Sequence, residues 1–412
     1  MIFQMKNSNT LIQRSKQSPK IIISGAGIGG LSAALCLIEQ GIDCEVYEQA
    51  SELKEVGAGL WLSVNGTRIL RSLGLEPQIK ESTLEADERV VRLWDSGKTW
   101  WLYKKGTTSS SHAPYVMLRA QLHRILIDAV NARKPGTIHL SSRCVGFTQH
   151  DDAVEIKLES GEVLRADALI GADGLHSKIR EQIFGPLPGR FTKALAWRGL
   201  VPMDRLPAHH RSRTVATWVG PLAHVSAYPA RWQNQEWMTF SGQVERSDWE
   251  IESWHEKGSV QECLSDFTGW HQDIVDIIKN TQTLHKWGLF VRDPLPFWTQ
   301  GRVTLLGDAC HSMVPYLGQG VNMAVEDACV LARCIVANPQ DLKLALKKYE
   351  QARLDRTTRV ANSAASMQYT FHHQDLAHPS TAHDYVSQQW SPEKSRQRYD
   401  WIYDYDATTV SV

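Results

Sequence analysis

The chain has 412 residues, of which 42% are hydrophobic and 22% are charged, an ordinary balance for a globular protein long enough for two domains. Its 45 basic residues match its 45 acidic residues, so no overall field would attract nucleic acid or an anionic membrane, and we expect neither as a partner. Seven cysteines without a C-x-x-C pair indicate reduced thiols, and we expect no metal site.

The N-terminal segment, residues 1–18, is expected to be a disordered extension. Its basic residues precede an apolar run at 21–38, a combination that resembles an export signal. Four glycines interrupt the run and would weaken a membrane-entering helix, and no clear small-residue cleavage site follows. We therefore expect a cytoplasmic protein.

The first elements predict a β-α-β unit and hence a parallel sheet. Residues 20–24 (KIIIS) have the pattern of a buried strand, residues 28–40 that of a helix with one apolar face, and residues 43–48 that of a second strand.

A glycine-rich turn joins the first strand to the helix. Gly25, Gly27 and Gly30 form the pattern G-x-G-x-x-G, which allows a tight turn, the close approach of a diphosphate and tight helix packing. Glu48, at the end of the second strand, is placed to accept hydrogen bonds from ribose hydroxyls. The unit predicts a bound dinucleotide, and both NAD and FAD use such a unit.

The remaining patterns alternate between the two kinds of element. Helical periodicity lies at 64–73, 119–132 and 321–336, and strand patterns lie at 154–158 and 163–172. A buried strand is expected at 303–307, and strand-like alternation lies at 88–105 and 195–245. We predict an α/β fold with two interleaved domains. The nucleotide domain takes residues 19–88, 113–190 and 290–371, the mostly antiparallel substrate domain takes 89–112 and 191–289, and 372–412 form a helical, aromatic tail.

A second segment with candidate ligand-binding residues follows the strand at 303–307. Asp308 lies where α/β folds place ligands, and its carboxylate can hold a polyol hydroxyl. Beyond Pro315, Gly318 and Gly320 lead into a helix whose N-terminal amides suit the negative charge of a reduced flavin ring. An ordinary loop with acids near a helix start would account for the same residues.

Three segments together carry a family resemblance. They are GAGIGG with Glu48, GADGLHS at 171–177, and GDACHSMVPYLGQGVNMAVED at 307–327. In this order and spacing they resemble the signatures of single-component FAD-dependent aromatic hydroxylases, the class A flavoprotein monooxygenases. The branch with salicylate hydroxylase, 3-hydroxybenzoate 6-hydroxylase and 6-hydroxynicotinate 3-monooxygenase is the most similar, over residues 19–370. The ending WIYDYDA at 401–407 also resembles it.

The resemblance implies a fold, a cofactor and a reaction. The nucleotide domain would be a Rossmann-like FAD domain of the glutathione-reductase type, as in para-hydroxybenzoate hydroxylase. NADH or NADPH would reduce the FAD, and a flavin C4a-hydroperoxide formed with O2 would hydroxylate a phenolic acid or hydroxypyridine, with or without decarboxylation. The same fold also serves epoxidases and tailoring oxygenases, and a reductase or dehydrogenase without oxygen insertion is a further alternative. The sequence leaves monomer and homodimer open.

The resemblance also implies roles for individual residues. Glu48 would bind the adenosine ribose, Arg119 the phosphate and ribityl portion, Asp173 the region shared by diphosphate and nicotinamide, and Asp308 the ribityl chain. Gly318, Gly320, Asn322 and Met323 would lie against the flavin ring through backbone contacts. The run Gly57-Ala58-Gly59 would line the route along which the flavin moves.

His224 and Tyr228 are the candidate catalytic residues. They lie four apart on an expected strand, so they face one side, and the pattern H-x-x-x-Y resembles that of 3-hydroxybenzoate 6-hydroxylase. A histidine can accept a phenol proton near neutral pH, although a packed pair within the sheet would look the same.

Two further residues, Trp61 and Pro315, are expected to line the substrate pocket. Trp61 replaces the histidine of hydroxynicotinate enzymes, and it acts either as a stacking wall or as core. The pair His372-His373 is interpreted as surface residues rather than a metal site.

Overall fold

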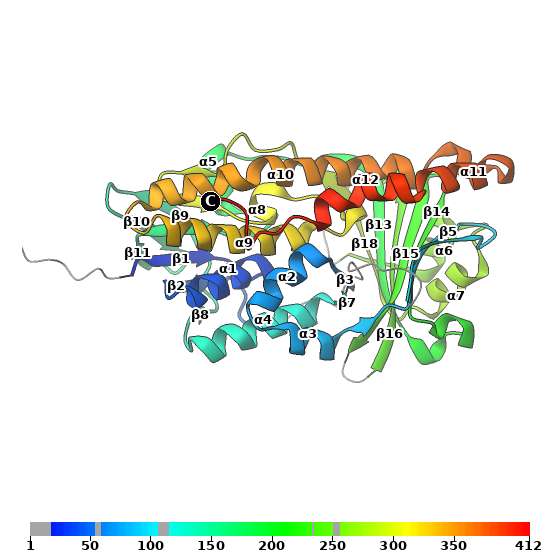
Figure 1. The fold of residues 1–412 in the computed structure, drawn as a ribbon, viewed down its shortest axis with the longest axis horizontal. Coiled ribbons are helices and arrows are strands. Elements are labelled where there is room, and N and C mark those ends of the chain that lie inside the picture. Colours follow the sequence, from blue (N-terminus) through cyan, green and yellow to red (C-terminus); the bar gives the residue numbers. More distant parts are fainter. Residues whose placement is uncertain (1–17, 54–58, 106–114, 233–234, 250–255) are drawn as a thin grey trace, which may run out of the picture.

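The computed structural model describes residues 18–53, 59–105, 115–232, 235–249 and 256–412. The predicted extension at 1–18 falls almost wholly outside these ranges, as do Gly57 and Ala58 and the predicted loop at 106–112. Two large sheets lie toward opposite ends of the molecule, and a long helix, α10 (Leu342–Phe371), runs along it beside both (Figure 1).

The first large sheet has six strands and matches the predicted α/β unit. Its order is β19 (Thr299–Gln300), β20 (Val303–Leu305), β12 (Ala168–Gly171), β1 (Lys20–Ser24), β2 (Asp43–Tyr47) and β8 (Ile138–His139), and all neighbours are parallel except β19 and β20. Ile21, Ile22 and Ile23 are fully buried because helices cover both faces of a parallel sheet. The helices α1 (Ile28–Glu39), α4 (Arg119–Arg133) and α9 (Gly320–Ala337) belong to this half.

The predicted strand at 163–172 is wrong as a single element. Residues Val163–Ala166 form β11, which pairs with β10 (Val154–Leu158) and, through it, with β9 (Cys144–Gln149) in a small separate sheet. The chain breaks at Asp167, whose carboxylate accepts a hydrogen bond from the Lys20 amide at 2.8 Å, and re-enters the main sheet as β12. Apolar alternation alone does not show such a change of sheet.

The second large sheet has eight strands and is almost entirely antiparallel, with one parallel pair, β14 and β5. Its order is β17 (Lys257–Gly258), β18 (Leu284–Val291), β13 (Arg190–Pro202), β16 (Gln235–Glu245), β15 (Ala223–Trp232), β14 (Thr214–Gly220), β5 (Glu88–Leu93) and β6 (Thr99–Lys104). All of these strands lie within the predicted substrate domain, apart from the edge residues Glu88, Arg190, Phe290 and Val291. The domain boundaries themselves stay a prediction.

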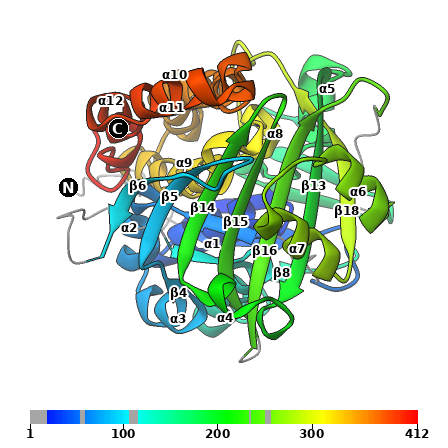
Figure 2. The ribbon, with the colours of Figure 1, turned by 90° about the vertical axis from the view of Figure 1, so that its right-hand side faces the viewer.

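Helices cover the outer face of this sheet. Figure 2 shows α6 (Val260–Asp266) and α7 (Gln272–Asn280) in front of the strands. Trp197, Val225 and Phe240 point to this side and pack with Phe267 and Ile274. The inner face, which carries the alternate residues of the same strands, meets the segment 307–323, which is predicted to face a flavin and is called the flavin loop below. It also meets the C-terminal helices α11 (Pro379–Gln389) and α12 (Pro392–Tyr403).

A second three-stranded sheet joins the two halves. It consists of β3 (Gly59–Leu62), β7 (Tyr115–Leu118) and β4 (Leu84–Glu85). In the chain, α2 (Val64–Ser72) and α3 (Glu76–Ser82) follow β3, and α4 follows β7. Because Gly59, the first residue of β3, pairs with Leu118, the start of α4 lies beside the start of β3. This junction places Trp61 and Arg119 between the nucleotide half and the inner face of the large sheet.

Candidate active site

The glycine-rich turn leaves one part of its backbone open. Gly25 has a φ of +106°, and a Cβ added there would lie 2.5 Å from the Ala172 carbonyl oxygen. A Cβ on Gly30 would lie 2.0 Å from the Gly25 carbonyl oxygen, so α1 packs tightly onto the turn. A Cβ on Gly27 would meet nothing within 4 Å. The space beside Gly27, at the N-terminus of α1, therefore fits a diphosphate.

Glu48 follows β2 directly, and its carboxylate accepts a hydrogen bond from the backbone of the turn. One carboxylate oxygen accepts a hydrogen bond from the Ala26 amide at 2.8 Å, and the other accepts one from the Ala50 amide at 2.9 Å. Each oxygen keeps further acceptor capacity, so ribose hydroxyls can still donate to it. Glu48, which is predicted to bind the ribose, therefore also fixes the backbone that would hold the diphosphate.

Asp173 has a buried carboxylate oxygen that lacks a partner within the described residues. Its Oδ2 accepts a hydrogen bond from the Lys178 amide at 2.8 Å, at the start of α5 (Lys178–Phe184), whereas Oδ1 is unsatisfied. Burial raises the pKa of Asp173, against the lowering effect of the Ser177 hydroxyl and nearby amides. Leaving such an acceptor unpaired costs about 1–3 kcal/mol, so the position fits a donor from a bound dinucleotide.

The segment after β20 turns twice before α9 begins. Gly307 has a φ of +65°, and the exposed Asp308 then starts the short helix α8 (Asp308–His311). Gly318 has a φ of +62° and ends the turn η3 (Pro315–Leu317). The first hydrogen bond of α9 runs from the Met323 amide to the Gln319 carbonyl, so the helix itself does not use the amides of residues 320–322. These amides and Asp308 fit a flavin ring and its ribityl chain.

Asn322 has a structural role that the sequence did not reveal. Its side-chain amide donates to the carbonyl oxygens of Trp61 at 3.1 Å and Gly318 at 3.0 Å, and its oxygen accepts from the Ser63 amide at 3.1 Å. Both Asn322 and the neighbouring Met323 are fully buried. The Asn322 side chain therefore ties β3 to the flavin loop, which leaves only its backbone for the predicted ring contact.

A row of polar residues crosses the middle of the eight-stranded sheet. Arg198 lies opposite Ser241, Ser241 opposite Ser226, and Ser226 opposite Thr217, so the four side chains share one face. All four are partly exposed, although the other residues of β15 from Ala223 to Ala230 are buried. Partial exposure inside a layered sheet indicates a cavity beside Ser226.

His224 and Tyr228 flank this cavity on β15. The His224 ring lies 5.2 Å from the ring of Tyr316, which belongs to η3 in the flavin loop. Tyr228 packs edge-on against Trp61 at 6.4 Å, and a Cβ on Gly59 would lie only 2.3 Å from its Oη. Both side chains therefore face the nucleotide half, and Ser226 lies between them.

Trp61 lies against the flavin loop, because a Cβ on Gly318 would be 3.2 Å from the Trp61 Cβ, and Pro315 belongs to the same loop. Trp61 is partly exposed, and the Arg89 guanidinium stacks over its ring at 4.9 Å. Its indole nitrogen is buried without a partner among the described residues. Pro315 starts η3, directly before Tyr316. The structure brings these two residues, His224 and Tyr228 to one region.

Arg119 and Arg198 place positive charge in the same region. Arg119 is the first residue of α4, and Arg198 stacks over the Trp287 ring at 4.6 Å. Burial lowers the pKa of Arg198 to about 10, Tyr228 acts against this shift, and Arg119 adds to it. Burial also raises the pKa of Tyr228 to about 12, against the effect of Arg198.

Arg198, Glu245 and His372 were not predicted as site residues, and the interpretation of His372 as a surface residue is wrong. His372 is 5% exposed and hydrogen bonds to His224. Its burial depends on where α10 ends against the sheet, which no local pattern shows. Arg198 and Glu245 do lie on predicted strands, but their faces follow only from the pairing of β13, β15 and β16.

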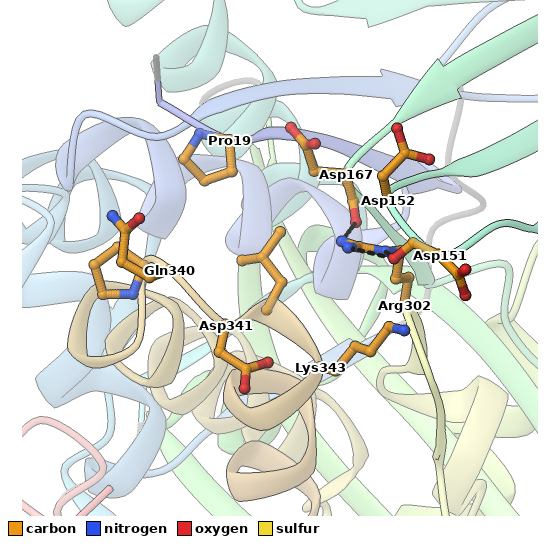
Figure 3. A pocket seen from close by; sticks show the side chains of 10 residues that line it. Pro19, Asp151, Asp152, Asp167, Arg302, Gln340, Asp341 and Lys343 are labelled. Carbon is orange, nitrogen blue, oxygen red and sulfur yellow. Dashed lines mark hydrogen bonds between the residues drawn. The ribbon is translucent and has the colours of Figure 1, made fainter. Parts of the chain in front are cut away.

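A groove elsewhere on the molecule does not belong to this site (Figure 3). It is lined by Pro19, Asp167 and Arg302, which precede β1, β12 and β20, and by the loop before α10. Arg302 donates to the carbonyl oxygens of Asp151 and Asp167. The groove therefore lies at the amino ends of the parallel strands, whereas open α/β sheets bind ligands at the carboxyl ends.

Among the described residues, two groups of three residues each place possible metal-ligand atoms within 4.8 Å of one another. They are His209, His210 and Asp273, and Cys310, His311 and Asp327. In the second group Asp327 pairs with both His311 and Arg353. The expectation that the protein has no metal stays a prediction.

No helix within the described residues is long and apolar enough to cross a membrane.

The open space at Gly27, the unpaired oxygen of Asp173 and the loop at 307–323 define an FAD-binding oxidoreductase whose flavin loop faces a polar cavity. The chain belongs to the FAD binding domain family, which matches residues 19–364.

Named relatives place the chain among the monooxygenases of this family. It is 35% identical over 400 residues to 3-amino-4-hydroxybenzoate 2-monooxygenase of Streptomyces platensis, covering 96% of this chain and 98% of that protein. It is 30% identical to 6-hydroxynicotinate 3-monooxygenase of Bordetella bronchiseptica, covering 94% and 95%. It is also 30% identical to 3-hydroxybenzoate 6-hydroxylase of Polaromonas naphthalenivorans, covering 94% and 96%. The protein is an FAD-dependent monooxygenase of aromatic compounds, as predicted.

Solved structures agree with the fold. Klebsiella pneumoniae HpxO, complexed with FAD and uric acid, has a TM-score of 0.79 at 27% identity and covers 94% of this chain and 96% of its own. A substrate complex of salicylate hydroxylase has a TM-score of 0.79 at 22% identity, covering 95% and 97%. The predicted combination of a Rossmann-like FAD domain and a mostly antiparallel sheet is confirmed.

Proposed function

We propose that this enzyme uses NADH or NADPH and O2 to hydroxylate a small aromatic substrate that carries both a carboxylate and a ring hydroxyl. The position of Arg198 in the polar row carries the proposal. FAD, when bound, supplies the reduced ring that activates O2. The seven cysteines are all buried and unpaired, which supports a reducing, cytoplasmic setting.

Arg198 is the residue that we assign to the substrate carboxylate. A guanidinium presents a planar fork of donors that matches a carboxylate. Strands in a sheet lie about 4.8 Å apart, so β13 and β15 are separated by about 10 Å. An aromatic ring with its carboxylate toward Arg198 and its hydroxyl toward β15 fits between them, over Ser241 and Ser226. The names of the three relatives describe compounds with both groups.

His224 and Tyr228 are the residues that we assign to the ring hydroxyl. They lie on either side of Ser226, and burial lowers the pKa of His224 well below its usual range, which keeps the imidazole neutral. A neutral imidazole can accept the hydroxyl proton and so raise the electron density of the ring. Burial keeps Tyr228 protonated, so its hydroxyl can donate a hydrogen bond to the substrate.

The test compares acids with their analogues. The holoenzyme is mixed with 3-amino-4-hydroxybenzoate, 3-hydroxybenzoate or 6-hydroxynicotinate, and with the same rings without the carboxylate. NADH and NADPH oxidation and oxygen uptake are followed, and product mass shows a gain of one oxygen atom or replacement of the carboxylate by a hydroxyl. We expect at least one acid to stimulate turnover far more than its analogue. Equal stimulation by both members of every pair would contradict the proposal.

Arg198→Met sharpens the test. Losing a charge-assisted hydrogen bond costs about 1.5–3 kcal/mol, so KM for the acid should rise about 10- to 100-fold. KM for the analogue without carboxylate should change little. Arg231→Met is the control, because Arg231, five residues beyond Ser226 on β15, is a partly buried arginine of the same sheet that pairs with Glu236.

A further inference from the structure

Three titratable side chains form a hydrogen-bonded line from the cavity toward the surface. His224 Nδ1 lies 2.7 Å from His372 Nε2, and His372 Nδ1 lies 2.8 Å from Glu245 Oε1. His224 is 2% exposed and His372 is 5% exposed, whereas the Glu245 side chain is 32% exposed. The line therefore begins beside the proposed substrate and ends in contact with solvent.

Several independent contacts fix this line in place. The Gln368 side chain donates to Glu245 at 3.2 Å, and the His372 amide donates to the Gln368 carbonyl at 2.9 Å. Phe371 packs against the His224 ring at 4.6 Å. The end of α10 thus holds His372 between β15 and β16.

The other ionisable neighbours leave the line undisturbed. Tyr316 donates to the Gln368 side chain at 3.3 Å, and burial raises its pKa, so it stays protonated. Arg246, next to Glu245 in the chain, is paired with Asp248 and Asp266. Glu245 is therefore the anion that His372 contacts.

The hydrogen bonds determine which nitrogen carries each proton. The hydrogen bond from His372 lowers the pKa of Glu245, and burial lowers the pKa values of both histidines, so a carboxylate faces two neutral rings. A carboxylate only accepts, so His372 Nδ1 must donate to it. His372 Nε2 is then an acceptor, and His224 Nδ1 must donate to it. The proton of His224 is therefore on Nδ1, and Nε2 keeps its lone pair.

We infer that Glu245 and His372 are positioning residues that hold His224 with an unprotonated Nε2 toward the substrate hydroxyl and relay the accepted proton to solvent. The inference rests on the proposed function. Within the described residues, only Nδ1 of His224 has a hydrogen-bond partner, which leaves Nε2 for a ligand.

The proton transfer balances without any change of oxidation state. The substrate O–H bond breaks as an N–H bond forms at His224 Nε2. The Nδ1 proton of His224 moves to His372 Nε2, the Nδ1 proton of His372 moves to Glu245, and Glu245 releases a proton to water. The net result is a phenolate in the cavity, one proton in solvent and both imidazoles with their proton on Nε2. The reverse transfers, which return a proton to the product hydroxyl, restore the starting tautomers.

The test measures ionisation of a bound phenol in the oxidised holoenzyme, without turnover. 3-Amino-4-hydroxybenzoate is titrated into wild type and into Glu245→Gln between pH 6 and 9, and the absorbance change of the phenolate is recorded. We expect wild type to ionise the ligand at lower pH than free solution does, and Glu245→Gln to lose most of this shift. Its kcat should fall about 100-fold at neutral pH and recover as the pH rises, because a positioned general base contributes about 10²- to 10⁴-fold.

A second variant and a matched control protect the test. His372→Gln should behave like Glu245→Gln, while His373→Gln, a half-exposed neighbour that contacts Asp375, should match wild type. FAD content and melting temperature show whether each variant is folded. Phenolate formation and pH profiles unchanged from wild type in both Glu245→Gln and His372→Gln would overturn the relay. Wild-type failure to oxidise NADH or NADPH with any acid would instead overturn the proposed function.

Discussion

Gly27→Ala separates folding from cofactor binding, because the chain itself has room for the added methyl group. Gly27 has a φ of −68° and a ψ of 177°, which alanine adopts without strain, and a Cβ there meets nothing within 4 Å. We expect the apoprotein to be as stable as wild type, or more stable by up to about 1 kcal/mol, since alanine restricts the unfolded chain. The diphosphate of FAD, however, needs the space that the methyl group takes.

The expected loss of affinity follows from the hydrogen bonds at this turn. Displacing the diphosphate by one methyl radius removes at least one charge-assisted hydrogen bond from a backbone amide, which is worth about 1.5–3 kcal/mol. FAD affinity should therefore fall about 10- to 100-fold. Titrating deflavinated protein with FAD and following flavin fluorescence gives the Kd, and thermal unfolding without FAD gives the stability.

Gly30→Ala is the contrasting variant. Its Cβ would lie 2.0 Å from the Gly25 carbonyl oxygen, so it should destabilise the apoprotein itself. A Gly27→Ala protein that binds FAD with the wild-type Kd would show that the diphosphate does not approach this turn, and the assignment of the cofactor site would be wrong.

Other changes test the packing around the site. Gly59→Ala forces a Cβ to within 2.3 Å of Tyr228 Oη and should cost about 1–3 kcal/mol in urea unfolding. Arg353→Met removes one ion-pair partner from two fully buried carboxylates on α9. Glu326 keeps Arg356 and Asp327 keeps His311, so the change should cost about 1–3 kcal/mol in the same assay. Burial lowers the pKa values of His224 and His372, so the unfolded chain binds protons first as pH falls below about 6.5. Their contribution to stability should therefore be complete above that pH and decline below it, which urea unfolding between pH 8 and 5 will measure.

Local patterns predicted most of the nucleotide half. The strand Lys20–Ser24 and the helix Ile28–Glu39 agree with the predicted ranges to within a residue, because apolar periodicity and the flanking glycines act over a few residues. The helix predicted at 321–336 spans Gly320–Ala337 for the same reason. The family resemblance then indicated the cofactor, which the glycine pattern alone left open.

The polar cavity could not be predicted from local sequence patterns because it depends on strand register. Arg198, Ser241 and Ser226 are far apart in sequence, and a shift of one residue in either pairing would turn one of them to the outer face. His372 lies 148 residues from His224, and its histidine neighbour made it look like a surface residue. A long-range contact of this kind has no signal in a single sequence.

Helix α10 contacts both halves of the site. Arg353 on this helix pairs with Glu326 and Asp327, both fully buried on α9, the helix into which the flavin loop leads. His372 lies nineteen residues further along, or about 28 Å at 1.5 Å per residue. Because the ion pairs fix the middle of α10 to α9 and the histidine line fixes its C-terminal end to the sheet, the distance between the flavin loop and His224 is set by one rigid element. Moving the flavin loop relative to His224 would require bending this helix between two points that buried polar contacts hold.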